Sequence, residues 1–182
     1  KSNAQSSFQI EPYQDSRVIT TGMPFLLIAP DARAAAMGDM GVATSPDAFS
    51  QKWNASKYVF STTKSGVSLS YTPYLSRLVN DIGIGHLTYF NRINEQSAFG
   101  ASFTYFSLGE IEFVEDEFST PLVQKPNEFA LDLSYSLRLS DQFGMGVTMR
   151  YLRSDLKLNT GGNDISPAST FGVDISGYYQ SE

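Results

Sequence analysis

Apolar and aromatic residues recur at nearly every second position in three stretches of this chain, residues 129–139, 143–151 and 171–179. A repeat of two residues is the period of a β-strand, because successive side chains of a strand point to opposite faces of the sheet. The connections are unequal: residues 140–142 allow only a tight turn, whereas residues 155–170 form a long polar segment. Alternating short and long connections are typical of outer-membrane β-barrels, which have short turns on one side and long loops on the other.

The composition argues against two other classes of protein. Hydrophobic residues make up 41% of the 182 residues and aromatic residues 13%. No window approaches the roughly 18 consecutive apolar residues of a membrane-spanning helix, and the most apolar run, residues 23–30, is far too short. The net charge is -6 and Lys and Arg are scattered, so no basic stripe exists for phosphates and nucleic acid is not expected as a partner.

The strand pattern begins near residue 65 and predicts a hairpin over residues 81–108. The register of this hairpin stays open, because its turn around Asn94 and Glu95 fits two loop lengths. A two-residue loop places His86 opposite Phe103, whereas a three-residue loop shifts every pair and so changes which side chains share a face.

The hairpin over residues 129–151 has a better defined register. If residues 140–142 form its turn, Leu139 lies opposite Phe143, and counting back pairs apolar residues with apolar residues on one face. The other face is polar and places Asp132 opposite Arg150, a pair of opposite charges that stabilises such a register by about 0.2–1 kcal/mol. Asp132 and Arg150 are therefore the predicted charge pair of a barrel lumen.

An antiparallel sandwich would also have one apolar and one polar face. Three details favour a transmembrane antiparallel β-barrel within the all-β class. The strands reach about ten residues, the length that a tilted membrane strand needs, and the polar face is rich in Ser, Thr and Gly. Aromatic residues also gather at strand ends, where interfacial girdles lie: Phe129, Phe143, Tyr151, Phe171 and Tyr179.

Six strands are predicted between residues 61 and 182, fewer than the eight of the smallest bacterial barrels. An open sheet edge in lipid leaves backbone groups unpaired at a cost of several kcal/mol each. We therefore expect only the N-terminal part of a barrel here, with further strands or another chain completing the wall.

The first 60 residues have a different character. Residues 1–22 are polar and without period, which predicts an extended arm. Residues 23–60 are rich in Gly and Ala and predict two short helices, one over residues 30–38 and one over residues 45–53. Such a segment fits a plug inside a barrel, and the alternative is a small helical subdomain beside a sheet.

The sequence offers little for catalysis or for a cofactor. His86 is the single histidine and no G-x-S-x-G motif accompanies it, so a serine triad is not expected. Phosphate-binding and zinc-protease motifs are absent, and the acidic residues of the connection 109–127 lack the spacing of an EF-hand. We expect no enzyme activity, no metal and no cofactor.

The segments 23–38, 41–48 and 53–58 resemble the N-terminal signature of the PorV family of the Bacteroidetes type IX secretion system, which is related to the FadL transporters. The resemblance implies a FadL-type barrel in the bacterial outer membrane, in contact with its lipid. It also implies a function: binding the C-terminal signal domain of secreted cargo and shuttling it from a SprA-like translocon to a PorU-like attachment complex.

The two long connections are the parts able to meet cargo under this hypothesis. The candidate contact residues are Glu112, Glu115, Asp116, Glu117, Asn159 and Asp164. The alternative function is FadL-like transport of a hydrophobic small molecule, which requires an apolar pocket lined by the plug.

Overall fold

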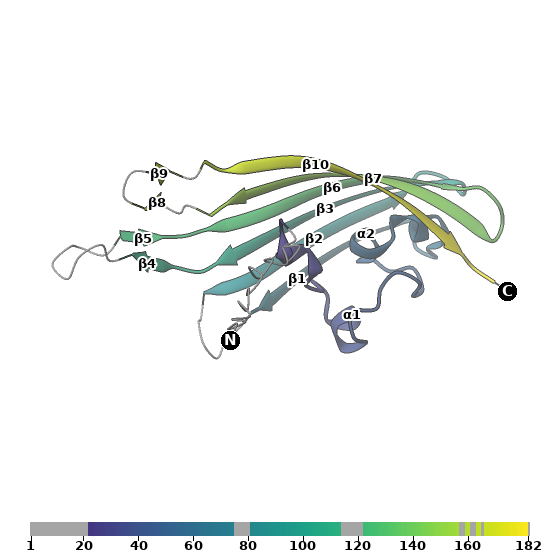
Figure 1. Ribbon diagram of the computed structural model, residues 1–182. Coiled ribbons are helices and arrows are strands. Elements are labelled where there is room, and N and C mark those ends of the chain that lie inside the picture. The colour runs from purple at the N-terminus through teal and green to yellow at the C-terminus, as the bar shows by residue number, and fades with distance from the viewer. Residues whose placement is uncertain are drawn as a thin grey trace, which may run out of the picture.

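A computed structural model describes residues 22–74, 81–113, 122–156, 159–160, 163–164 and 166–181 (Figure 1). Six long strands form one antiparallel sheet in the order β1-β2-β3-β6-β7-β10. Their bounds are Ser65–Pro73, Ile82–Arg92, Ser97–Leu108, Asn127–Arg138, Phe143–Asp155 and Ala168–Tyr179. The prediction of a mostly β chain with six antiparallel strands is confirmed. The sheet is open, since β1 and β10 are its edges and do not pair with each other, so closure into a barrel stays a prediction.

The long connections are not plain loops. Between β3 and β6 lie the short strands β4 (Ile111–Phe113) and β5 (Leu122–Gln124), which pair with each other. Between β7 and β10 lie β8 (Asn159–Thr160) and β9 (Asn163–Asp164). Both pairs stand at the same end of the sheet, opposite the short turns (Figure 1). Strands of two or three residues are too short to show a period, which is why the sequence pattern predicts loops here.

The N-terminal segment, residues 23–60, lies against one face of the sheet (Figure 1). It contains η1 (Pro24–Leu27), α1 (Ala32–Ala36), α2 (Ser50–Trp53) and η2 (Ala55–Phe60), and η2 packs against β2, β3, β6, β7 and β10. The second helix begins at Ser50, not near residue 45 as predicted. Asp47 fixes the turn that precedes α2. The backbone N–H of Asp47 donates to Ser50 Oγ (3.0 Å), and the Ser50 hydroxyl donates to the carboxylate of Asp47 (3.1 Å). Among the described residues, no helix is both long enough and apolar enough to cross a membrane.

The two faces of the sheet have opposite character. The face under the N-terminal segment, here called the covered face, buries mostly polar side chains, among them His86, Thr88, Ser102, Thr104, Asp132, Ser134 and Ser136. The opposite face, here called the open face, exposes large apolar side chains, among them Leu87, Tyr89, Phe103, Leu131, Leu133, Tyr135, Val147, Met149, Val173 and Ile175. This distribution is the reverse of a sheet in water, where the apolar face packs on the core.

Two small apolar clusters fix the N-terminal segment to the covered face. Near the short turns, Tyr58 stacks on Phe90 with ring centroids 4.5 Å apart, beside Ala55, Val59 and Ala98. Near the long connections, Phe25 packs with Ile84 and Ala130 and stacks on Phe106 at 5.9 Å. Thr88, Ser102 and Asp132 lie level with one another between these clusters.

The structure shows which residues pair in the two predicted hairpins. In β6–β7, Leu133 lies opposite Met149 and Asp132 opposite Arg150, so the predicted register is confirmed. In β2–β3, His86 lies opposite Thr104, which is the register of the three-residue loop. Asn94 selects that loop, because its Oδ1 accepts from the backbone N–H groups of Gln96 (2.9 Å) and Ser97 (2.7 Å).

Candidate functional site

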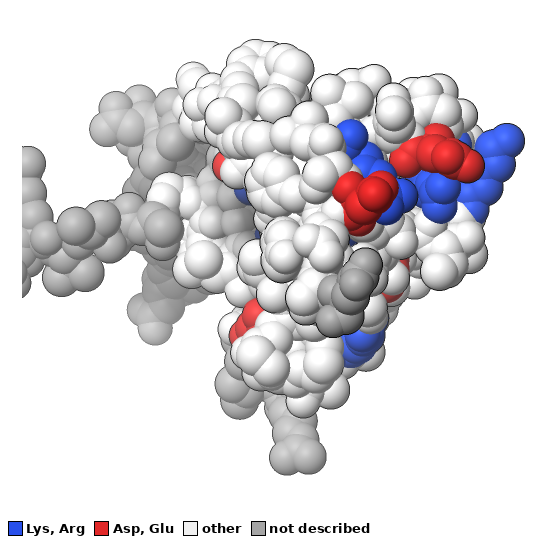
Figure 2. Space-filling view, turned by 90° about the vertical axis from the view of Figure 1, so that its right-hand side faces the viewer, with Lys and Arg blue, Asp and Glu red and all other residues white. Residues whose placement is uncertain are grey.

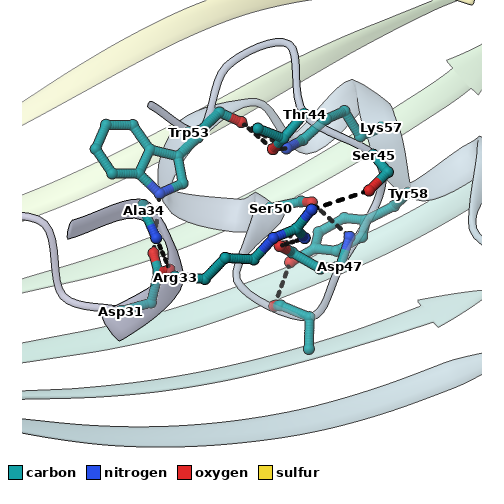
Figure 3. A network of polar contacts seen from close by, with 12 residues as sticks. Asp31, Arg33, Ala34, Thr44, Ser45, Asp47, Ser50, Trp53, Lys57 and Tyr58 are labelled. Atoms are coloured by element: carbon teal, nitrogen blue, oxygen red, sulfur yellow. Dashed lines mark hydrogen bonds and ion pairs between the residues drawn. The ribbon is translucent and has the colours of Figure 1, made fainter. Parts of the chain in front are cut away.

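The N-terminal segment is held in shape by side-chain hydrogen bonds more than by its short helices (Figure 3). Asp31 caps α1, since its Oδ1 accepts from the backbone N–H of Ala34 at 2.7 Å, and its Oδ2 accepts from Trp53 Nε1 at 3.1 Å. Arg33 forms an ion pair with Asp47 at 2.8 Å. These contacts join α1 to the chain around α2.

Lys57 and Tyr58 complete this network from η2 (Figure 3). Lys57 Nζ donates to the carbonyl of Gly41 at 2.6 Å and to Thr44 Oγ1 at 3.2 Å. Burial lowers the pKa of Lys57, and the nearby carboxylate of Asp47 opposes that effect. Tyr58 Oη donates to the carbonyl of Ala48 at 3.0 Å and accepts from the backbone N–H of Gln51 at 2.8 Å. Burial raises the pKa of Tyr58, so the phenol keeps its proton.

Direct hydrogen bonds join the segment to the sheet. Ser134 Oγ donates to Gln51 Oε1 at 2.6 Å, and Ser136 Oγ donates to the carbonyl of Ala55 at 2.9 Å. Thr88 Oγ1 donates to the carbonyl of Ala48 at 2.8 Å. Because these bonds come from β2 and β6, the small polar residues of the covered face serve as a binding surface for the segment.

Glycines on the covered face allow close approach. A Cβ on Gly100 would lie 2.3 Å from Gln51 Oε1, and one on Gly144 would lie 2.9 Å from the side chains of Val59 and Phe60. A Cβ on Gly146 would lie 3.1 Å from the backbone nitrogen of Ser56, so Gly144 and Gly146 allow η2 to pack closely on β7.

A charged group lies beneath α2. Arg150 Nε donates to Asp132 Oδ1 at 2.7 Å, and Arg150 Nη1 lies 3.5 Å from Asp174 Oδ2. Lys52 Nζ donates to the carbonyl of Leu26 at 2.5 Å. Burial, together with the positive charge of Arg150, lowers the pKa of Lys52 to about 8, while Asp132 and Asp174 act in the opposite direction. The pair of Asp132 and Arg150 thus has the predicted contact; its place in a barrel lumen stays a prediction.

An apolar cavity of about 800 Å³ opens at the long-connection end. Its lining comes from η1 and the strand ends, chiefly Phe25, Leu27, Ile28, Tyr74, Phe106, Leu108 and Leu156. Leu27 is 69% exposed. Among the described residues of the lining, the charged ones are Asp39 and Glu128. The apolar run 23–30, part of the predicted plug, supplies much of this lining.

Three of the predicted cargo-contacting residues lie on the short strands of the long connections. Glu112 is exposed on β4, opposite Val123. Asn159 and Asp164 lie opposite each other in the β8–β9 pair. Glu115, Asp116 and Glu117 lie outside the described residues. Glu112 does not line the cavity.

His86 is buried against β3 and takes no part in a catalytic arrangement of the described residues. Its Nδ1 lies 2.8 Å from Thr104 Oγ1, and its ring lies 6.1 Å from that of Phe49. Across the described part of the chain, no three His, Asp or Glu side chains come together as a metal site.

Compared with known families, residues 11–182 match the family described as "Type IX secretion system protein PorV". No curated protein matches the chain.

Proposed function

Because the chain belongs to the PorV family of type IX secretion system proteins, we propose that it acts by binding protein. In this proposal it forms part of an outer-membrane barrel that binds the C-terminal signal domain of secreted cargo. It carries that cargo from a SprA-like translocon to a PorU-like attachment complex, and it makes and breaks no covalent bond itself.

The open face supports a place in the outer membrane. Its aromatic side chains form a row across four strands, with ring centroids 5.9 Å apart for Phe103 and Phe129, 6.0 Å for Phe129 and Tyr151, and 5.0 Å for Tyr151 and Phe171. Phe143 lies opposite Tyr179 near the short turns. Tyr151 and Phe143 are eight residues apart on β7, or about 26 Å along the strand. For a strand tilted by about 40°, that length spans about 20 Å of the membrane, so the two aromatic levels lie near the borders of an apolar barrel band of about 25 Å.

The apolar cavity carries the binding part of the proposal. Cargo released through the outer membrane arrives at the end of the barrel that bears the long loops, and the cavity opens at the long-connection end. Leu27 offers a large apolar surface there. A cargo domain that inserts an aromatic or aliphatic side chain would gain about 1.5–3 kcal/mol from its burial. Apolar anchors of this kind dominate the affinity of many protein interfaces.

A pull-down of the detergent-solubilised protein with a cargo signal domain tests this proposal. Leu27→Glu places a carboxylate at the cavity mouth, and we expect it to weaken cargo binding about tenfold or more, because a charge must then be buried. Val42→Glu is the matched control, since Val42 is also exposed on the N-terminal segment, at 57%, but does not line the cavity. Unchanged cargo binding by Leu27→Glu would contradict a role of the cavity in cargo recognition.

The same cavity supports a second candidate, FadL-like transport of a hydrophobic small molecule. Its volume of about 800 Å³ suits such a ligand. Asp39 and Glu128 at the lining would repel a fatty acid carboxylate, which favours the protein-binding function. Specific fatty acid uptake together with failure to bind any cargo signal domain would reverse that preference.

A further inference from the structure

A second cavity, of about 490 Å³, lies at the short-turn end of the covered face, away from the apolar cavity. Its lining is mainly polar and includes Phe60, Arg92, Arg138, Asp141, Gln142 and Gln180. Figure 2 looks onto this end of the molecule, where basic and acidic side chains gather on one side. Two guanidinium groups therefore share one cavity, and Asp141 is the one carboxylate among the described residues of its lining.

Arg92 has spare hydrogen-bonding capacity at this cavity. One of its terminal nitrogens donates to the carbonyl of Ser61. Its Nε is buried and has no hydrogen-bond partner among the described residues. Arg92 also forms no ion pair with a described carboxylate. A buried donor without a partner is destabilising, and more so when the group is charged, so a site with this donor favours an acceptor that brings negative charge.

Arg138 is positioned by the protein but its charge is poorly neutralised. Its guanidinium lies 5.2 Å from the ring centroid of Phe60, and it donates to the carbonyls of Ser140 (3.2 Å) and Asp141 (2.9 Å). The carboxylate of Asp141 lies 3.5 Å away and is fully exposed. Exposed ion pairs of this kind contribute little. The cavity therefore retains a positive charge.

The two arginines are spaced to share one ligand. Arg92 ends β2 and Arg138 ends β6, with β3 between them. The register places Ser136 level with Arg92, so Arg138 lies two residues further along, and the two backbones are about 12 Å apart. Ala98 lies opposite Arg92 on β3 and is buried, and its small side chain leaves room beside Arg92. Guanidinium groups bind phosphate and related oxyanions through two parallel hydrogen bonds.

We propose that this cavity binds a phosphate group, held between Arg92 and Arg138. The phosphate can come from free inorganic phosphate or from a phospholipid head group, which present the same oxygens. This inference is independent of cargo binding, which we place at the opposite end of the sheet.

Titration of the detergent-solubilised full-length protein with inorganic phosphate, followed by calorimetry at constant ionic strength, tests the proposal. We expect saturable binding, and a loss of affinity of about tenfold or more in Arg92→Gln and in Arg138→Gln. Arg153→Gln is the matched control, because Arg153 is exposed near the other end of β7, and it should bind as the unchanged protein does. Emission from Trp53, the single tryptophan, reports whether each variant is folded.

Nanodiscs distinguish the two sources of the phosphate. If a lipid head group occupies the cavity, anionic phosphatidylglycerol discs should weaken phosphate titration relative to detergent, and Arg92→Gln should remove that difference. If free phosphate is the ligand, both conditions should give the same affinity. Absence of saturation in the unchanged protein, or equal affinity in the folded Arg92→Gln, Arg138→Gln and Arg153→Gln variants, would overturn the proposal.

Discussion

At the residue scale, Lys52 of the N-terminal segment places a charged group in the polar space between the segment and the sheet. Its ammonium group donates to the carbonyl of Leu26 and lies near the ion pair of Asp132 and Arg150. Burial is the largest of the effects that together lower its pKa from 10.5 to about 8. The charged form of Lys52 is therefore a cost to the folded state, which the nearby carboxylates only reduce.

This pKa predicts a stability that rises with pH. Between pH 8 and 10.5 the unfolded state keeps the Lys52 proton while the folded state loses it, so the free energy of unfolding increases over that window. The increase from Lys52 should be at most about 3 kcal/mol. In Lys52→Met it should disappear, whereas Lys64→Met, at an exposed position, should keep it. Denaturant unfolding followed by Trp53 emission at a series of pH values measures this, and identical pH profiles for Lys52→Met and the unchanged protein would refute it.

At the element scale, the N-terminal segment depends on the sheet for its structure. Its helices contain four to six residues, far below the roughly 12 residues at which an isolated helix becomes even marginally stable. Hydrogen bonds to Ser134 and Ser136, and close approach at the strand glycines, replace helix length as the source of order.

Gly100 tests this dependence. A Cβ there would also lie 2.7 Å from Ser134 Oγ and 2.8 Å from the ring of Tyr58, so we expect Gly100→Ala to displace α2 and η2 and to cost about 1–3 kcal/mol. Gly85→Ala is the control, because its Cβ would meet nothing closer than 4.0 Å. Limited proteolysis should cut the N-terminal segment of Gly100→Ala faster than that of Gly85→Ala. Equal rates for the two variants would show that the segment does not need this close contact.

The elements also show what the sequence could predict. The alternation of apolar and polar residues predicted the long strands and the β6–β7 register. A one-residue shift in the pairing of these strands would place apolar residues opposite polar ones on both faces of the sheet. The alternation could not choose the β2–β3 register, which depends on hydrogen bonds from the side chain of Asn94. The predicted start of α2 was too early. Helix propensity does not include the hydrogen bonds between Asp47 and Ser50 that keep the residues before Ser50 out of the helix.

At the scale of the whole molecule, the sites were harder to predict than the fold. The apolar cavity joins Phe25, Phe106 and Leu156, and the phosphate site joins Arg92 and Arg138 across an intervening strand. Residues so far apart in sequence have no spacing that a motif could reveal. The pair of Asp132 and Arg150 was predictable because one tight turn fixed which residues face each other.

The reversed polarity of the sheet gives a prediction for the whole molecule. If the open face contacts lipid, an arginine at Leu133, in the middle of β6, should destabilise the membrane-inserted state by about 2–4 kcal/mol. An arginine at Leu139, next to the short turn, should cost only about 0–1 kcal/mol, because it reaches the interface. Both leucines are exposed on the open face, at 46% and 59%, so their contacts within the chain do not explain such a difference.

Equilibrium folding of the full-length protein into lipid vesicles, as a function of denaturant, measures both free energies. Leu133→Arg and Leu139→Arg introduce the same charged side chain. The difference between their free energies of folding therefore reports the effect of depth in the bilayer. The same comparison in aqueous detergent-free buffer is not informative, since the open face then lacks an apolar environment. Equal costs for the two variants in vesicles would mean that the open face is covered by protein and that lipid does not surround it.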